Sequence, residues 1–116
     1  MSTLTRIIIS TISIIAVGYI LPGVVVSSVY TAFIVAIILA LLNMIVKPIL
    51  IILTLPVTIV TLGLFLLVIN GIIVLIATHF IRGFSVSSLF IAIVFSILVS
   101  LINGLLGINS LNEKKD

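Results

Sequence analysis

Four long apolar stretches are the feature that most constrains the fold of this chain. They run from about Ile7 to Leu21, Val29 to Val46, Gly63 to Ile81 and Ser87 to Leu106. An apolar segment of about 20 residues is long enough to cross a bilayer as an α-helix. Because hydrophobic residues make up 64% of the chain and charged residues 6%, too few polar groups are present to cover a water-soluble domain. The sequence therefore predicts a single all-α integral membrane domain with four transmembrane helices.

The second and fourth stretches carry small residues at every fourth position. Positions four apart lie along one face of a helix, so each stretch forms a ridge of small side chains. The two ridges are Ser28, Ala32, Ala36 and Ala40, and Ser88, Ala92, Ser96, Ser100 and Gly104. In lipid, such ridges let two helix backbones approach closely enough for dispersion contacts and hydrogen bonds to hold them together. We therefore expect the second and fourth helices to pack ridge against ridge.

The two halves of the chain resemble one another at a shift of sixty residues. The matches least explained by apolar composition are Gly23/Gly83, Ser27/Ser87, Ser28/Ser88, Ala32/Ala92 and Asn43/Asn103. We interpret them as a duplicated helical hairpin, although chance similarity between apolar helices is the alternative. The hairpins would cover residues 6–46 and 66–108, with an apolar linker at 47–65 and a polar tail at 109–116. Two crossings in each half would relate the hairpins by a pseudo-twofold axis near the membrane normal.

The segments between the predicted helices are less determined. Pro22-Gly23 ends the first helix, the short apolar run Val24–Val26 would complete its crossing, and Ser27 or Ser28 would cap the second helix. The Lys47-Pro48 pair predicts a break, because proline disfavours helical geometry in the residue before it. Residues 49–62 would then either extend the neighbouring helices into kinked spans or form a re-entrant hairpin, and we favour a bent or re-entrant linker.

The distribution of charge predicts the orientation of the chain. Four crossings place Arg6, Lys47, Lys114 and Lys115 on one face and leave Arg82 alone on the other. The positive-inside rule assigns the richer face, and with it both termini, to the cytoplasm. Lys47 and Arg82 are candidates for contact with lipid headgroups. No basic patch with interleaved aromatic residues is present, so we expect no nucleic-acid partner.

The beginning of the chain has a second interpretation. Arg6 followed by an apolar run resembles a signal peptide, with Ala16-Val17-Gly18 as a weak cleavage site. The apolar character continues beyond this point and the duplicated hairpin requires the first helix. We therefore expect the segment to be retained.

Residues suited to catalysis or metal binding are nearly absent. The chain has no cysteine, its only histidine is His79, and its only acids are Glu113 and Asp116 near the C-terminus. No carboxylate pair, nucleophile triad or metal cluster can be assembled from this set. The sequence predicts a protein that is not an enzyme and needs no cofactor, with His79 as an interfacial side chain.

Three asparagines remain as candidate functional residues. Asn43, Asn70 and Asn103 lie within the apolar stretches, where a side-chain amide without a partner costs a few kcal/mol. They would either form interhelical hydrogen bonds, worth about 1 kcal/mol each, or line a polar path for a solute or lipid headgroup. We favour the structural role and keep the path as an alternative.

Several short motifs resemble those of a known family. They are Leu21-Pro22-Gly23, Ala40-Leu41-Leu42-Asn43 with Lys47-Pro48, Leu53-Thr54-Leu55-Pro56, Thr61-Leu62-Gly63-Leu64-Phe65 and Val68-Ile69-Asn70. Together they resemble the YvlD-like membrane proteins, or phage holin family 4 (superfamily IV), over nearly the whole chain. Members commonly have Arg where this chain has Lys47, and Pro where it has Arg82. The resemblance implies a small bacterial inner-membrane protein with four helices and brings no catalytic residues.

These observations lead to two hypotheses about function. The first is a holin-like or envelope-stability protein that acts by forming homo-oligomers in the bilayer, because large apolar faces remain outside the ridges. The second is a channel or lipid-translocating protein whose path is lined by the three asparagines. Membrane lipids are the expected partners in both.

Overall fold

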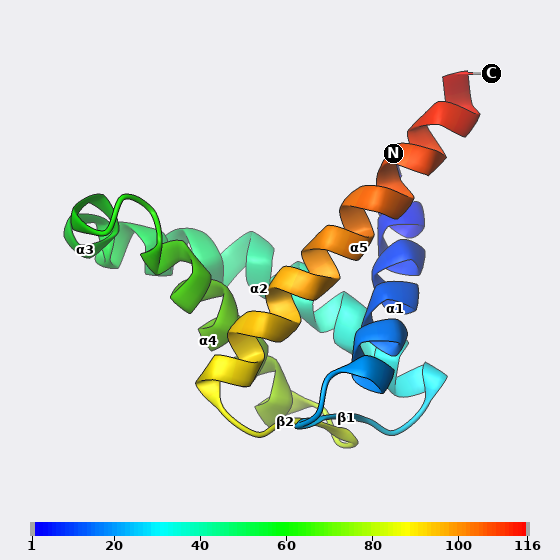
Figure 1. Ribbon diagram of the computed structural model, residues 1–116, viewed down its shortest axis with the longest axis horizontal. Helices are drawn as coiled ribbons and strands as arrows, with labels where there is room; N and C mark the ends of the chain where they lie inside the picture. The colour runs from blue at the N-terminus through cyan, green and yellow to red at the C-terminus, as the bar shows by residue number, and fades with distance from the viewer. Residues whose placement is uncertain (1, 116) are drawn as a thin grey trace.

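The chain folds into five helices and a short two-stranded ribbon (Figure 1). A computed structural model describes the backbone of residues 2–115 and the side chains of residues 2–107. In chain order the elements are α1 (Thr3–Ile20), β1 (Val24–Val26), α2 (Val29–Leu53), α3 (Leu55–Val60), α4 (Phe65–Phe80), β2 (Phe84–Val86) and α5 (Leu89–Lys115). Both termini lie at one end of the molecule, and the ribbon lies at the other (Figure 1).

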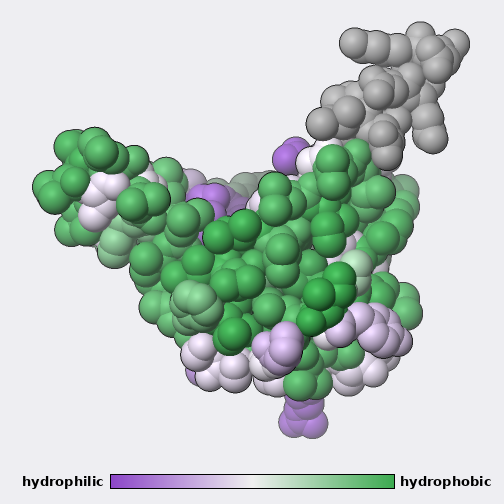
Figure 2. All heavy atoms as spheres, viewed as in Figure 1, coloured by the Kyte–Doolittle hydropathy of each residue, from purple (hydrophilic) through white to green (hydrophobic). Residues whose placement is uncertain are grey.

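The helices have the length and composition of membrane spans. Within the described residues, α1, α2 and α5 are long and apolar enough to cross a bilayer, and α4 is a shorter apolar helix. Figure 2 shows a largely hydrophobic face, with hydrophilic residues concentrated towards its edges. The predicted all-α membrane fold is confirmed.

The ribbon joins the two halves of the chain at the end opposite the termini. We expected Val24–Val26 to complete the first crossing. Instead, this segment pairs antiparallel with Phe84–Val86. The central pair is Val25 with Ser85, which are sixty residues apart. The flanking hydrogen bonds also match, because Ser27 N–H donates to Gly83 O at 2.9 Å and Ser87 N–H donates to Gly23 O at 2.8 Å. Pairing satisfies backbone groups that would otherwise be left unbonded where the helices end.

The helices do not pack as the small-residue ridges predicted. α1 packs against both α2 and α5, and α4 packs against the same two helices, whereas α2 and α5 make no extensive contact with each other. The predicted ridge-to-ridge packing is therefore wrong. Ala32, Ala36 and Ala92 are instead buried in a shared core that also contains apolar side chains of α1 and α4.

Large apolar side chains fill this core near the ribbon. The largest fully buried ones are Phe95, Ile14, Val17 and Val35. The ring of Phe95 packs against that of Phe84 from the ribbon, with centroids 5.6 Å apart and planes inclined at 57°. Such a tilted aromatic pair is favourable beyond its buried area, so the core couples the ribbon to α5.

Serine hydroxyls begin three of the helices. Ser2 accepts from the Thr5 amide and starts α1 four residues before the expected Ile7. The amide of Thr31 donates to Ser28 at 3.1 Å, which confirms the predicted cap of α2. Ser88 accepts from the amide of Ile91 in the same way. Each bond satisfies a helix N–H that has no partner within the helix.

The expected break at Lys47-Pro48 is absent. Helix α2 continues through Pro48 to Leu53, although Pro48 has no N–H to donate to the preceding turn. Continuing the helix keeps the other backbone groups bonded, and lipid offers them no alternative partner.

Residues 48–64, which we name the apolar arm, comprise the end of α2, the short helix α3 and the turn into α4. The arm projects from the rest of the molecule (Figure 1), and its bends agree with the bent linker that we favoured. Thr54 Oγ1 donates to Leu50 O at 2.7 Å where α2 ends. Thr61 Oγ1 donates to Val57 O at 3.0 Å and accepts from Phe65 N at 3.1 Å. The threonines thus satisfy backbone groups at each bend.

The expected polar tail, residues 109–116, continues the backbone of α5 as far as Lys115. Its side chains, including those of Glu113 and Asp116, lie outside the described residues.

Two helical glycines provide a matched test of this packing. A Cβ at Gly71 would lie 2.6 Å from Ile93 Cγ1 and 3.2 Å from Ile93 N, whereas a Cβ at Gly104 meets nothing within 4 Å. Alanine favours a helix by about 1 kcal/mol over glycine, but overpacking costs about 1–3 kcal/mol. We expect Gly71→Ala to lower the melting temperature in detergent and Gly104→Ala to raise it or leave it unchanged. Equal melting temperatures for the two variants would contradict the close approach of α4 and α5.

Candidate functional site

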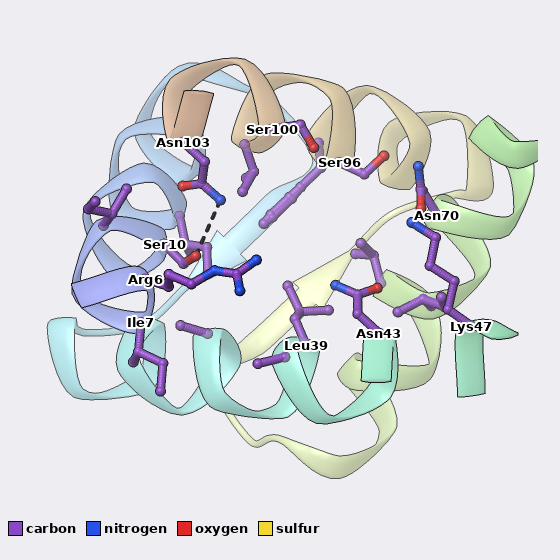
Figure 3. A pocket seen from close by; sticks show the side chains of 18 of the residues that line it. Arg6, Ile7, Ser10, Leu39, Asn43, Lys47, Asn70, Ser96, Ser100 and Asn103 are labelled. Atoms are coloured by element: carbon purple, nitrogen blue, oxygen red, sulfur yellow. Dashed lines mark hydrogen bonds between the residues drawn. The ribbon is translucent and has the colours of Figure 1, made fainter. Parts of the chain in front are cut away.

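An open cavity of about 770 Å³ lies among α1, α2, α4 and α5 (Figure 3). It is lined by residues near the start of α1, such as Thr3, so it lies towards the end of the molecule that carries the termini. The polar and charged lining residues are Thr3, Arg6, Ser10, Asn43, Lys47, Asn70, Ser96, Ser100 and Asn103. All three asparagines singled out in the sequence therefore meet at one cavity.

The cavity walls follow the same sixty-residue correspondence as the ribbon. Lining residues sixty positions apart include Ser10/Asn70, Ala36/Ser96, Ala40/Ser100 and Asn43/Asn103. Each wall from the first half of the chain thus faces a counterpart from the second half.

Asn103 joins α5 to α1 through hydrogen bonds with Ser10 and Ser13, and we name these three residues the clamp. The hydroxyl of Ser13 donates to Asn103 Oδ1 at 2.6 Å, and Asn103 Nδ2 donates to Ser10 Oγ at 3.2 Å. Ser13 also donates to Ile9 O at 3.0 Å within its own helix. Asn103 therefore makes the interhelical hydrogen bonds that the sequence suggested for the asparagines, but its partners lie on α1.

Asn43 is placed differently, although it is the counterpart of Asn103. Among the described residues no hydrogen bond involves the side chain of Asn43 or Asn70, and both line the cavity (Figure 3). The difference follows from the residue sixty positions after Ser13, which is Ile73. A buried isoleucine cannot donate to Asn43, so this amide remains available to a solute or lipid group.

Two cations face this cavity. The side chain of Arg6 extends from α1 into the space, and Lys47 enters from α2 on the other side of the view (Figure 3). Their counterparts in the second half are Leu66 and Gly107, so the first half of the chain supplies both charges. The polar lining is therefore nearly symmetric in position but not in charge.

The other predicted site residues lie elsewhere. Arg82 and His79 are exposed near the ribbon, at the end opposite the cavity, so they cannot act on the same group as Lys47. Of the two ridges, Ser28 and Ser88 are caps and Ala32 and Ala92 are buried. Ala36, Ala40, Ser96, Ser100 and Gly104 line the cavity, so the upper parts of both ridges face it.

Sequence reasoning assigned Arg6 only to topology and did not identify the clamp on α1. The missing signal was the spacing of Arg6, Ser10 and Ser13, which lie four and seven residues along the same helix. Residues at this spacing share a helix face. This polar face of an otherwise apolar helix indicates a polar partner inside the protein.

The comparisons with known proteins concern both the family and one relative. The family described as Mycobacterial 4 TMS phage holin, superfamily IV, matches residues 1–105. The "Uncharacterized membrane protein YvlD" of Bacillus subtilis (strain 168) is 58% identical over 55 residues, which are 47% of this chain and 45% of that protein. The aligned part thus spans less than half the length of the relative. No solved structure matches. The resemblance drawn from the motifs is confirmed.

Substitutions of Asn43 and Asn103 test whether these two equivalent asparagines have different roles. Asn103→Leu removes two interhelical hydrogen bonds, which in lipid contribute about 1–2 kcal/mol in total, so the protein should melt earlier in detergent. Asn43→Leu removes no such bond and should leave the melting temperature nearly unchanged. If Asn43→Leu destabilises as much as Asn103→Leu, the assignment of different roles is wrong.

Proposed function

Because the chain belongs to the family of the mycobacterial four-spanning phage holins, superfamily IV, we propose that it is a non-enzymatic protein of the bacterial inner membrane. In this proposal it is a holin-like or envelope-stability component that acts by assembling with copies of itself. The observation that carries the proposal is the apolar arm, which its own chain leaves uncovered.

The arm has the properties of a surface that needs a covering partner. Helix α3 contains no buried residue, and Val60 and Leu62 are 81% and 93% exposed. No charged residue occurs in residues 48–64. A helical segment that is apolar on all sides must be covered by lipid or protein. Because the arm projects beyond the four-helix body (Figure 1), it can reach a neighbouring copy.

The proposed orientation places the cavity and both termini in the cytoplasm. At the ribbon end, Tyr19 and Tyr30 are 89% and 74% exposed, and tyrosine is enriched where a protein crosses the headgroup layer. Arg6 and Lys47 lie at the opposite end, which is also the end of the lysine-containing C-terminus. Positive residues favour the cytoplasmic side, which supports this assignment.

Cysteine cross-linking tests the assembly, since the natural chain contains no cysteine. We expect Leu62→Cys in liposomes to yield covalent dimers on oxidation, because the arm would contact a second copy. Tyr19→Cys, at an equally exposed residue away from the arm, serves as the matched control and should yield several-fold less dimer. Dimer yields that are equal for the two variants, or that fall to zero on dilution with lipid, would exclude assembly through the arm.

The cavity favours a second candidate function, transport of a solute or lipid along a path lined by Asn43 and Asn70. Their amides line an open cavity and have no side-chain partner among the described residues. Asn103 is less suited to testing a path, because it holds α1 and α5 together.

Reconstitution at low protein density separates transport from assembly. A transporter should release solute or exchange lipids between leaflets at about one copy per liposome, and Asn43→Leu or Asn70→Leu should reduce the rate about tenfold without lowering the melting temperature. Assembly instead predicts leakage that rises steeply with density and survives both substitutions. Transport unaffected by both variants would exclude the asparagine-lined path.

A further inference from the structure

The cavity concentrates positive charge without a counterion. Arg6 and Lys47 both line it, and no acidic side chain does in the part of the chain that the structure describes. Bringing a cation into surroundings less polar than water is unfavourable unless an anion or several acceptors compensate it. Both side chains therefore favour an anionic ligand in this space.

The uncharged polar groups of the cavity add donors for such a ligand. Asn43 and Asn70 each carry an amide N–H₂ group that no described side chain accepts from. An arginine presents five N–H donors in a planar fork and a lysine three, and these groups match the oxygens of a phosphate. Two cations and two amides, supplied by α1, α2 and α4, can thus surround one phosphate group.

The rest of the lining indicates which kind of molecule would carry that phosphate. Ile7, Ile9, Leu39 and Val99 form apolar walls beside the polar groups, and the apolar arm begins directly after Lys47. A free inorganic anion gains nothing from apolar walls, whereas the glycerol and first acyl carbons of a lipid do. A volume of about 770 Å³ lies within the usual range for small-molecule sites.

We propose that the cavity binds the phosphate group of an anionic phospholipid from the cytoplasmic leaflet. Arg6 and Lys47 hold the phosphate from opposite sides, Asn43 and Asn70 donate to its remaining oxygens, and the acyl chains leave along the apolar walls. One copy of the chain supplies every group, so the site does not rest on the proposed assembly. Its failure and the failure of assembly are therefore measured separately.

Native mass spectrometry of the detergent-purified protein tests the site, with phosphatidylglycerol and phosphatidylcholine of equal chain length as probes. We expect the natural protein to retain one phosphatidylglycerol at least tenfold more strongly than phosphatidylcholine. Arg6→Gln and Lys47→Gln should each lower phosphatidylglycerol retention about tenfold, the effect of losing one charge-assisted hydrogen bond. Arg82→Gln removes a cation of the same type that does not line the cavity, so any headgroup contact of Arg82 is separate and retention of the one cavity-bound phosphatidylglycerol should be unchanged.

Thermal melting keeps the test independent of folding defects. Phosphatidylglycerol should raise the melting temperature of the natural protein and of Arg82→Gln, but not of Arg6→Gln, while Arg6→Lys should restore part of the increase. An equal increase with inorganic phosphate would show that the site takes free phosphate and would overturn its assignment to lipid. Equal retention of both lipids, or equal losses in all three glutamine variants, would overturn the site itself.

Discussion

The ring of contacts among α1, α2, α4 and α5 is the constraint on which the rest of this structure depends. Each of these helices packs against two of the other three, and the four surround a central space. Near the ribbon the space is filled by Phe95 and the apolar side chains around it. Towards the termini it stays open. In lipid, polar side chains are stable only against one another or beside a wet cavity, so the polar residues of the four helices gather there.

Small differences between the two halves of the chain give equivalent positions different roles. Asn103 finds a donor in Ser13, whereas the residue sixty positions after Ser13 is Ile73, which has no hydrogen-bond donor in its side chain to offer Asn43. Arg6 and Lys47 have no charged counterpart in the second half. The cavity is thus asymmetric: Asn103 is held by α1, whereas the amides of Asn43 and Asn70 and the cations of Arg6 and Lys47 have no side-chain partner among the described residues.

The proposals concern two surfaces that adjoin at the end of the molecule carrying the termini. The apolar arm begins directly after Lys47, which lines the cavity. A residue suited to binding a headgroup and a surface suited to acyl chains therefore follow one another along α2. Membership of a holin family describes the kind of membrane protein but does not by itself supply a mechanism. The mechanism has to come from these two surfaces, one suited to copies of the chain or lipid tails and the other to an anion.

The class of fold was predictable from the sequence because long apolar stretches leave a chain few alternatives to membrane helices. The serine cap of α2 and the bent linker were predictable for local reasons, since they depend on neighbouring residues. The sixty-residue shift also pointed to positions that line one cavity, including Asn43 and Asn103. The break predicted at Lys47-Pro48 is wrong, because the local preference of one residue counts for less than unbroken hydrogen bonding in lipid.

Only the tertiary structure decided which helices touch. A ridge of small residues shows which face of a helix is slim but not which helix approaches it, because lipid provides no hydrophobic force that selects one partner. The ribbon between residues 24–26 and 84–86 and the clamp from Ser13 to Asn103 depend on contacts between segments sixty or ninety residues apart. The sequence alone therefore determined that this is an all-α membrane protein with a few polar groups to accommodate. The packing of the helices determined that those groups surround a cationic cavity.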